Sequence, residues 1–265
     1  MMVGQANLMN KLKDISLDSF PRSLILFGED GCGKHSYCNL ISNKLDLELK
    51  DITESITLET INDIYSRANP YLYIIDSSLI SIKEQNMILK FIEEPLKNSY
   101  IILLCENKQS LLPTILNRCH IWHFESYSRA ELDSFGIKDV YGIASTPGQL
   151  LELEGVDIDP IIKLVDSIID RMANASISNA LSISNKIAFK EEKDKFNLKL
   201  FNRVLMFRVF NRVKESSNSL ILEMYKLVSS YINNSFTPRV DAKILLDNLI
   251  VNLWEVTHTY GTATT

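Results

Sequence analysis

The chain has 265 residues, of which 46% are hydrophobic and 23% charged, and its formal net charge at pH 7 is -5. This length supports a sizeable core and favours two or three domains over one. The negative charge argues against a protein that coats nucleic acid by bulk positive charge, but it leaves a local basic surface open. No apolar run approaches the ~20 residues that span a bilayer, and the start lacks the layout of a signal peptide, so we expect a soluble, cytoplasmic protein with no membrane partner.

The first elements lead to a glycine-rich loop. Residues 9–15 predict a helix, and Leu24-Ile25-Leu26-Phe27 predicts a buried strand. The next residues, Gly28-Glu29-Asp30-Gly31-Cys32-Gly33-Lys34-His35-Ser36, precede a segment that can continue as a helix to residue 45. This order is that of the phosphate loop G-x-x-x-x-G-K-[ST], in which backbone N–H groups surround phosphate oxygens, the lysine reaches the terminal phosphates and the hydroxyl holds Mg²⁺.

One position of this loop does not fit the pattern. Gly28, Gly33 and Lys34 match, but His35 stands where the hydroxyl is required. The alternative is a glycine turn with a solvated lysine, and the order of strand, loop, lysine and helix favours an inherited nucleotide site over it. The residues that would hold a nucleotide are Gly28, Gly31, Gly33, Lys34, His35 and Ser36, together with Asp76 further along the chain.

Asp76 ends the apolar run Tyr71-Leu72-Tyr73-Ile74-Ile75-Asp76, which predicts a central parallel strand. An aspartate there can orient Mg²⁺ through water beside a phosphate loop. It can equally be a strand-terminal acid that caps the following helix. Ser77 follows at the position where a hydrolase of this kind would keep a glutamate to polarise the attacking water, so hydrolysis by this chain is doubtful.

The rest of the first half repeats strand and helix. A helix is expected over residues 57–68, closed by Asn69-Pro70, and another over 81–94, stopped by Pro95. Residues 100–104 predict a strand, 111–116 a short helix and 120–124 a strand, which together predict a parallel sheet covered on both faces. The second half is expected to be helical, with short helices over 128–155, longer ones over 160–172, 177–189, 196–214, 220–232 and 242–257, and a frayed tail over 261–265.

Two side-chain patterns have plain structural interpretations. Cys32, Cys38, Cys105 and Cys119 lack the paired C-x-x-C spacing of zinc sites, so we expect reduced thiols and no zinc. The helix at 196–214 combines four phenylalanines, the first of them Phe196, with the basic residues Lys199, Arg203, Arg208 and Arg212. Stacking on nucleic acid is conceivable, but a core-facing aromatic stripe with a solvated basic face is the favoured interpretation.

Several separated stretches resemble one family. They are Gln85-Asn86-x-x-Leu89-Lys90-x-x-Glu93-Glu94-Pro95, then Leu111-Leu112-Pro113-Thr114-Ile115-Leu116-Asn117-Arg118-Cys119, and Ser145-Thr146-Pro147-Gly148-Gln149-Leu150. These motifs resemble AAA+ clamp-loader subunits, most of all the delta-prime subunits of bacterial DNA polymerase III, and residues 234–238 are similar to the start of the family's collar. The resemblance is dense over residues 20–125 and thin afterwards.

The resemblance implies a chain of three parts: a nucleotide-binding α/β domain over residues 1–126, a small helical lid segment over 127–158 and a helical collar over 159–265. Such subunits assemble with one another into rings that place a sliding clamp on primer–template DNA. In the family, the arginine of a Ser-Arg-Cys triplet is supplied in trans to ATP bound by the adjacent subunit. The triplet here is Asn117-Arg118-Cys119, so the resemblance gives this role to Arg118. The alternative is that Arg118 forms an internal salt bridge.

Four nucleotide-handling positions depart from the family together. They are His35, Ser77, Glu106 at the γ-phosphate sensor and Gln149 at the lid arginine. The zinc-binding insertion of many bacterial relatives is also missing. We therefore expect a stator, a subunit that hydrolyses little or no ATP and binds ATP or ADP weakly at most. Whether Mg²⁺ takes part is left open. The stator completes the ATP site of a neighbouring subunit with Arg118. The alternatives are an active ATPase that uses Lys34 and a purely structural module on an inactive nucleotide fold.

Overall fold

The computed structural model describes residues 3–66, 70–94, 99–137, 139, 142–172, 176–188, 197–215, 218–234 and 242–261. The chain divides into two compact units, Met1–Glu154 and Gly155–Thr265. Most of the lid segment lies within the first unit. Asn69, Pro95, Phe196, residues 235–238 and the tail beyond Gly261 lie outside the described residues, and so do the predictions made for them.

The first unit is built on a sheet in which every strand pair is parallel, in the order β2-β3-β4-β1-β5. Its strands are β1 (Ser23–Phe27), β2 (Glu48–Asp51), β3 (Tyr71–Asp76), β4 (Ser99–Cys105) and β5 (His120–His123). The sequence predicts all of these strands except β2. This strand is short, charged and at the edge of the sheet, so it lacks the apolar run that marks a buried strand.

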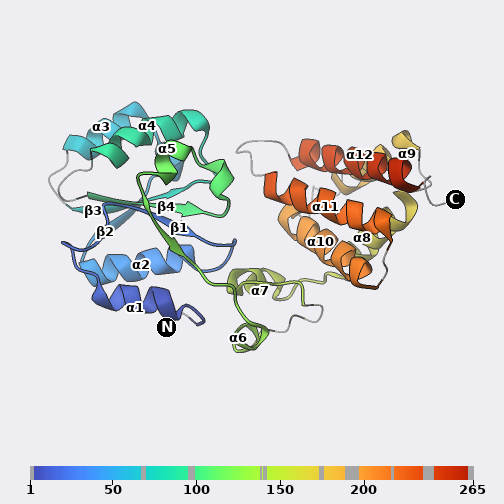
Figure 1. Ribbon diagram of the computed structural model, residues 1–265, viewed down its shortest axis with the longest axis horizontal. Helices are drawn as coiled ribbons and strands as arrows, with labels where there is room; N and C mark the ends of the chain where they lie inside the picture. Colours follow the sequence, from blue (N-terminus) through green and yellow to red (C-terminus); the bar gives the residue numbers. More distant parts are fainter. Residues whose placement is uncertain are drawn as a thin grey trace. The chain divides into compact units, whose positions relative to one another are not determined.

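Helices cover both faces of the sheet (Figure 1). They are α1 (Ala6–Asp14), α2 (Lys34–Leu45), α3 (Leu58–Ser66), α4 (Ile82–Glu93) and α5 (Pro113–Leu116). Alternate side chains along β1 and β4 enter two different cores, because successive strand residues point to opposite faces. Leu24, Leu26 and Ile102 pack with α1 and α2, while Ile25 and Leu103 pack with α3, α4 and α5.

The order of the strands brings three chain segments to one edge. The loop after β1, the turn after β3 and the segment after β4 all leave the carboxyl ends of neighbouring strands. The register pairs Asp76 with Leu104 and Phe27 with Cys105, so these ends are level. Open parallel sheets bind their ligands at this edge. The glycine-rich loop, Asp76 and Glu106 therefore belong to one place in the fold.

Two short helices complete the first unit. They are α6 (Arg129–Asp133), which begins with a capping box between Ser128 and Glu131, and α7 (Pro147–Leu153), whose N-cap hydroxyl is Thr146. Pro147 occupies the first turn of α7, where its missing N–H has no cost. Both helices therefore begin where local sequence signals place them.

The second unit is helical. Its helices are α8 (Asp159–Met172), α9 (Ile177–Ala188), α10 (Leu198–Glu215), α11 (Ser219–Asn234) and α12 (Ala242–Gly261). Apolar side chains such as Val165, Val204 and Leu249 are buried among them. Among the described residues, no helix is long and apolar enough to cross a membrane.

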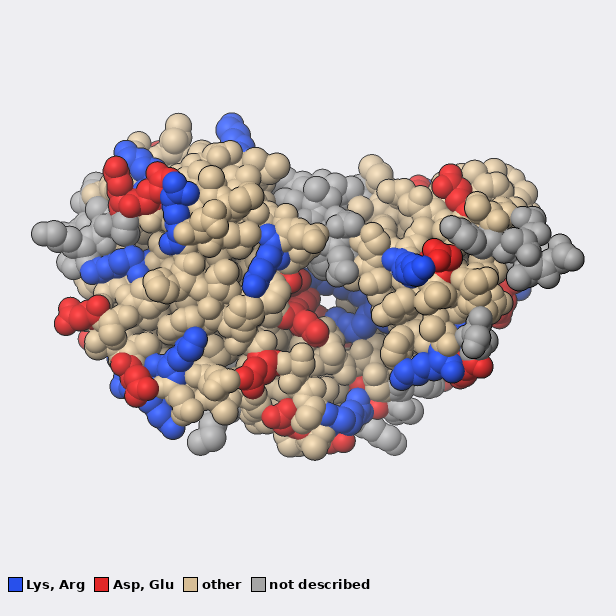
Figure 2. Space-filling model, in the orientation of Figure 1, with Lys and Arg blue, Asp and Glu red and all other residues tan. Residues whose placement is uncertain are grey.

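Two basic residues of α10, Arg208 and Arg212, form ion pairs within the unit. Arg208 donates to both carboxylate oxygens of Asp166, from Nε at 2.8 Å and from Nη2 at 2.9 Å, and Arg212 donates to Asp170 at 2.6 Å. Phe201 is buried. This part of α10 is thus occupied by core packing and ion pairs to α8, which favours the structural interpretation over nucleic-acid stacking. On the face shown in Figure 2, basic and acidic side chains of the described residues are interspersed over each unit.

Candidate functional site

The glycine-rich loop has the backbone that its sequence predicts. It connects β1 to α2, and Gly31 and Gly33 have φ angles of +74° and +102°. Residues with a side chain rarely adopt such angles, so the glycines permit this path. Gly33 is the N-cap of α2, and the first turn of that helix presents its N–H groups toward the loop. The chain retains the scaffold of a phosphate site.

Lys34 is engaged by the chain itself. Its side chain is only 8% exposed, and its ammonium group donates to the carbonyl oxygens of Gly28 at 2.8 Å and Glu29 at 2.7 Å. The Nζ atom also lies 3.9 Å from Glu106 Oε1. Opposite charges at this distance offset one another, most strongly away from bulk water. The positive charge that a phosphate loop offers to its ligand is therefore partly neutralised by the chain's own Glu106.

His35 and Ser36 both lie at the exposed start of α2. His35 Nε2 is 3.9 Å from Asp51 Oδ2, and both side chains are at least half exposed. An imidazole next to a carboxylate does not replace a hydroxyl as a ligand for Mg²⁺, which prefers oxygen atoms. Ser36 is one residue beyond the position where the phosphate-loop pattern needs its hydroxyl.

Asp76 stabilises the turn after β3 and does not cap the helix that follows. Its Oδ1 accepts hydrogen bonds from the N–H of Ser78 at 2.9 Å and from its hydroxyl at 2.7 Å, and its own N–H donates to Thr53 Oγ1 at 2.8 Å. The N-cap of α4 is Ser81, so Asp76 does not cap that helix. Ser77 is 2% exposed and carries no carboxylate. Ser77 therefore supplies no general base, and one carboxylate oxygen of Asp76 is already bonded to Ser78.

The lid segment is bonded directly to the loop. Thr146 Oγ1 donates to the carbonyl oxygen of Asp30 at 2.7 Å, and the N–H of Gly148 donates to that of Gly31 at 2.9 Å. Gln149 spans the contact, because its Nε2 donates to Asp30 O at 3.3 Å and its Oε1 accepts from the N–H of Ser145 at 2.9 Å. Gln149 is thus a bridge between lid segment and loop.

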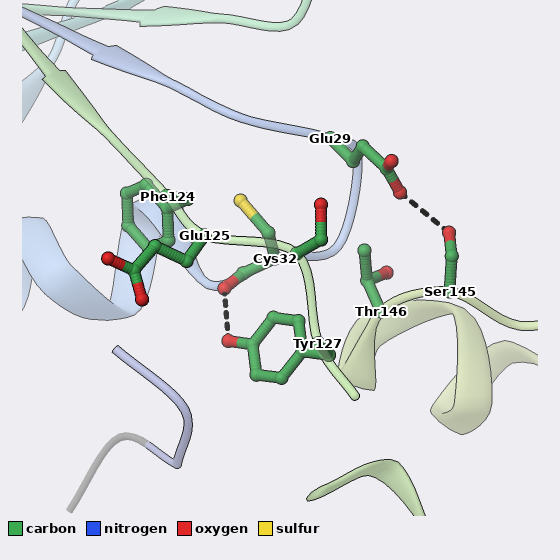
Figure 3. Close-up of a pocket in the computed structure, with 8 residues that line it drawn as sticks. Glu29, Cys32, Phe124, Glu125, Tyr127, Ser145 and Thr146 are labelled. Atoms are coloured by element: carbon green, nitrogen blue, oxygen red, sulfur yellow. Dashed lines mark hydrogen bonds between the residues drawn. The ribbon is translucent and has the colours of Figure 1, made fainter. Parts of the chain in front are cut away.

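A small hollow with a volume of about 20 Å³ lies beside this contact (Figure 3). Ligand pockets commonly measure ~300–1,000 Å³, so this one is small. Its lining includes two acids, Glu29 and Glu125, which would repel a polyphosphate. Figure 3 shows Tyr127 donating to Cys32 O at 2.8 Å and Ser145 donating to Glu29 at 2.6 Å. Burial raises the pKa of the Cys32 thiol to about 11, so this thiol is protonated and unreactive.

The isolated chain is therefore expected to bind nucleotide very weakly. We predict that ATP-γ-S binds with a Kd above ~1 mM, with or without Mg²⁺, in isothermal titration calorimetry. The variant Glu106→Gln removes the charge that offsets Lys34 and is expected to bind more tightly than the wild type. Lys44→Ala, an exposed change on α2, serves as the control. Binding at micromolar concentration that requires Mg²⁺ would instead support an active ATPase.

Arg118 lies away from the loop. It precedes the amino end of β5, whereas the loop follows the carboxyl end of the neighbouring parallel strand β1. Its Nε is 3.0 Å from Glu93 Oε1, and its Nη1 donates to the carbonyl oxygen of Thr114 at 3.0 Å. The internal salt bridge named as the alternative is thus present. The Arg118 side chain is still 42% exposed, and a guanidinium has further N–H donors for a ligand.

Gln85 is a structural residue whose role the sequence did not reveal. It is 2% exposed on α4, where its Nε2 donates to Ser110 O at 2.8 Å and its Oε1 accepts from Leu112 N at 2.9 Å. These bonds tie α4 to the segment that begins α5, and Arg118 follows α5. The available signal was a polar side chain on the inward face of an amphipathic helix.

Replacing Gln85 is expected to destabilise the first unit. Gln85→Leu leaves a backbone carbonyl and a backbone N–H without their partner, at a cost of about 2 kcal/mol or more in the free energy of unfolding. Urea denaturation followed by circular dichroism measures this change. Asn86→Ala, at the exposed neighbouring position, is expected to cost less than ~0.5 kcal/mol. Equal losses in the two variants would contradict the role of Gln85.

Among the described residues, no group of three or more His, Cys, Asp or Glu side chains is arranged to hold a metal ion. Burial raises the pKa values of Cys38 and Cys119 to about 12. Both thiols are consequently neutral at physiological pH, which suits packing better than metal binding.

Comparison with known proteins agrees with these features. The family described as DNA polymerase III, delta subunit matches residues 46–128. The DNA polymerase III subunit delta' of Haemophilus influenzae is 25% identical over an alignment of 108 residues that covers 36% of this chain and 33% of that protein. The matched region thus spans about a third of the length of this relative.

A solved structure supports the fold over a longer range. The DNA polymerase III gamma subunit-related protein of Thermotoga maritima superposes with a TM-score of 0.50 at 13% identity, covering 94% of this chain and 99% of that chain. At this identity the likeness concerns the fold. The predicted fold class, a phosphate-loop α/β domain with a parallel sheet followed by helices, is confirmed.

Proposed function

Residues 46–128 resemble the DNA polymerase III delta subunit family, and on this premise we propose that the chain is a clamp-loader subunit in DNA replication. It acts as a stator: it hydrolyses little or no ATP itself and supplies Arg118 to the ATP site of a neighbouring subunit. Its partners are the other subunits of the loader and, through the assembly, a sliding clamp and primer–template DNA.

The chain's own glycine-rich loop supports the first part of this proposal, that the chain hydrolyses little or no ATP itself. Lys34 is paired with Glu106, and Ser77 offers no base to activate water. The lid segment is hydrogen-bonded to Asp30 and Gly31. A triphosphate would have to break these contacts and bring its charge close to Glu106, which opposes binding.

The exposed guanidinium of Arg118 supports the second part of the proposal, that this residue acts at the ATP site of a neighbouring subunit. It lies at the amino end of the strands, while the chain's own loop lies at the carboxyl end. A guanidinium can contact phosphate oxygens in a planar arrangement and offset the charge that develops as phosphate is transferred. Because Arg118 is remote from its own loop, the nucleotide that it contacts is one held by another subunit.

The test is the ATP hydrolysis of the assembled loader. If Arg118 acts in trans, its replacement lowers hydrolysis at the neighbour's site without dissociating the assembly. An unchanged rate in an intact assembly would contradict the stator proposal.

The salt bridge between Arg118 and Glu93 favours a second candidate, a purely structural assembly module. In that case Arg118 serves only the fold, and its replacement leaves hydrolysis unchanged. The same measurement therefore separates the two functions.

A further inference from the structure

Glu93 is the last residue of α4, and its carboxylate meets the inner edge of the Arg118 guanidinium. The Nε–Oε1 distance is 3.0 Å, and the two side chains are 45% and 42% exposed. Ion pairs at such exposure contribute little to folding stability, because water and salt screen them. The pair is thus expected to orient the Arg118 guanidinium more than it stabilises the fold.

Both anchors of this guanidinium belong to helices that are fixed in the first unit. The buried side chains Ile88, Phe91 and Ile92 hold α4 against the sheet. The hydroxyl of Tyr65 on α3 donates to the carbonyl oxygens of Lys90 at 3.1 Å and Glu94 at 3.3 Å, which holds the end of α4. Thr114, which accepts from Arg118 Nη1, belongs to α5, and Gln85 ties the start of α5 to α4.

We propose that Glu93 is a positioning residue for Arg118: it fixes the guanidinium by its Nε edge and leaves the remaining donors directed at the neighbour's nucleotide. This inference rests on the proposed function. A long arginine side chain has several rotatable bonds, and a guanidinium held before the ligand arrives needs less ordering in the transition state. Glu93 does not touch the nucleotide and acts through Arg118.

The experiment measures ATP hydrolysis by the assembled loader with sliding clamp and primer–template DNA present. Glu93→Ala is expected to lower kcat about tenfold while KM for ATP stays within about twofold, the pattern of an interaction that counts in the transition state. Glu93→Gln keeps an oxygen acceptor at the same place and is expected to recover most of the rate. Glu94→Ala, at the adjacent exposed position, is the matched control and retains the wild-type rate.

A double-mutant cycle decides whether the effect passes through Arg118. In an Arg118→Ala background, Glu93→Ala is expected to cause no further loss of kcat. A further tenfold loss there, an unchanged rate for Glu93→Ala alone, or a rate above wild type would each overturn the inference. A wild-type rate for Arg118→Ala is a different result, because it refutes the proposed function itself.

Discussion

Arg118→Ala is expected to lower the clamp- and DNA-stimulated ATPase rate of the assembled loader by about 10³-fold, while the subunits remain assembled. The size follows from arginine fingers in phosphoryl transfer, which contribute ~10³–10⁵ in kcat by offsetting transition-state charge. The assembly should survive, because the Arg118 side chain is 42% exposed and its pair with Glu93 is of the weak, solvent-screened kind. Steady-state phosphate release measures the rate, and analytical ultracentrifugation measures the assembly.

Two further variants show which property of Arg118 matters. Arg118→Lys keeps the positive charge but loses the planar fork and is expected to recover only a small part of the rate. Lys44→Ala removes an exposed positive charge elsewhere on the first unit and is expected to have the wild-type rate. If Arg118→Ala instead dissociates the assembly, the residue has a structural role and the stator proposal loses its main support.

Gly148→Ala is expected to separate the lid segment from the loop. A Cβ atom on Gly148 would lie 2.5 Å from the Cα of Gly31 and 2.9 Å from its carbonyl oxygen. Both neighbours are backbone atoms, so no side chain can rotate away and the loop and α7 must move apart. The free energy of unfolding of the first unit is expected to fall by about 2–3 kcal/mol, as in other overpacked sites.

Hydrogen exchange locates this effect. Amides of residues 28–36 and 146–153 are expected to exchange faster in Gly148→Ala, because the bonds from Gly148 N to Gly31 O and from Thr146 to Asp30 are lost. Leu151→Ala, an exposed change on the same helix, is the control and should leave the loop amides protected. Unchanged protection in Gly148→Ala would mean that the loop does not depend on the lid segment.

The chain's own glycine-rich loop and Arg118 are held by different contacts, so weak ATP hydrolysis by this chain and the role of Arg118 in a neighbour's site are separate properties. Gly31 and Gly33 have the positive φ angles that the loop path requires, yet the partners of Lys34 are the loop carbonyls and Glu106. Arg118 is held by Glu93 and Thr114, far along the chain from the loop. A change in one region is therefore expected to leave the other intact, and additivity between Gly148→Ala and Arg118→Ala can test this.

The sequence by itself determined the main elements of the fold. Continuous apolar runs marked β1, β3 and β4, because parallel strands buried on both faces need them. Periodic apolar residues, capping residues and prolines marked the longer helices within a few residues of their observed ends. Strand β2 was not predicted, because an exposed edge strand has no continuous apolar run.

The loop pattern marked His35 as a departure, and the resemblance to clamp-loader subunits marked Ser77, Glu106 and Gln149. Only the tertiary structure decided what the substituted side chains contact. The pairing of Glu106 with Lys34, the bridge of Gln149 to Asp30 and the meeting of Gly31 with Gly148 join residues far apart in the chain. The same is true of Gln85 with Ser110 and Glu93 with Arg118. Such contacts depend on how packed elements face one another, and local propensity carries no information about that.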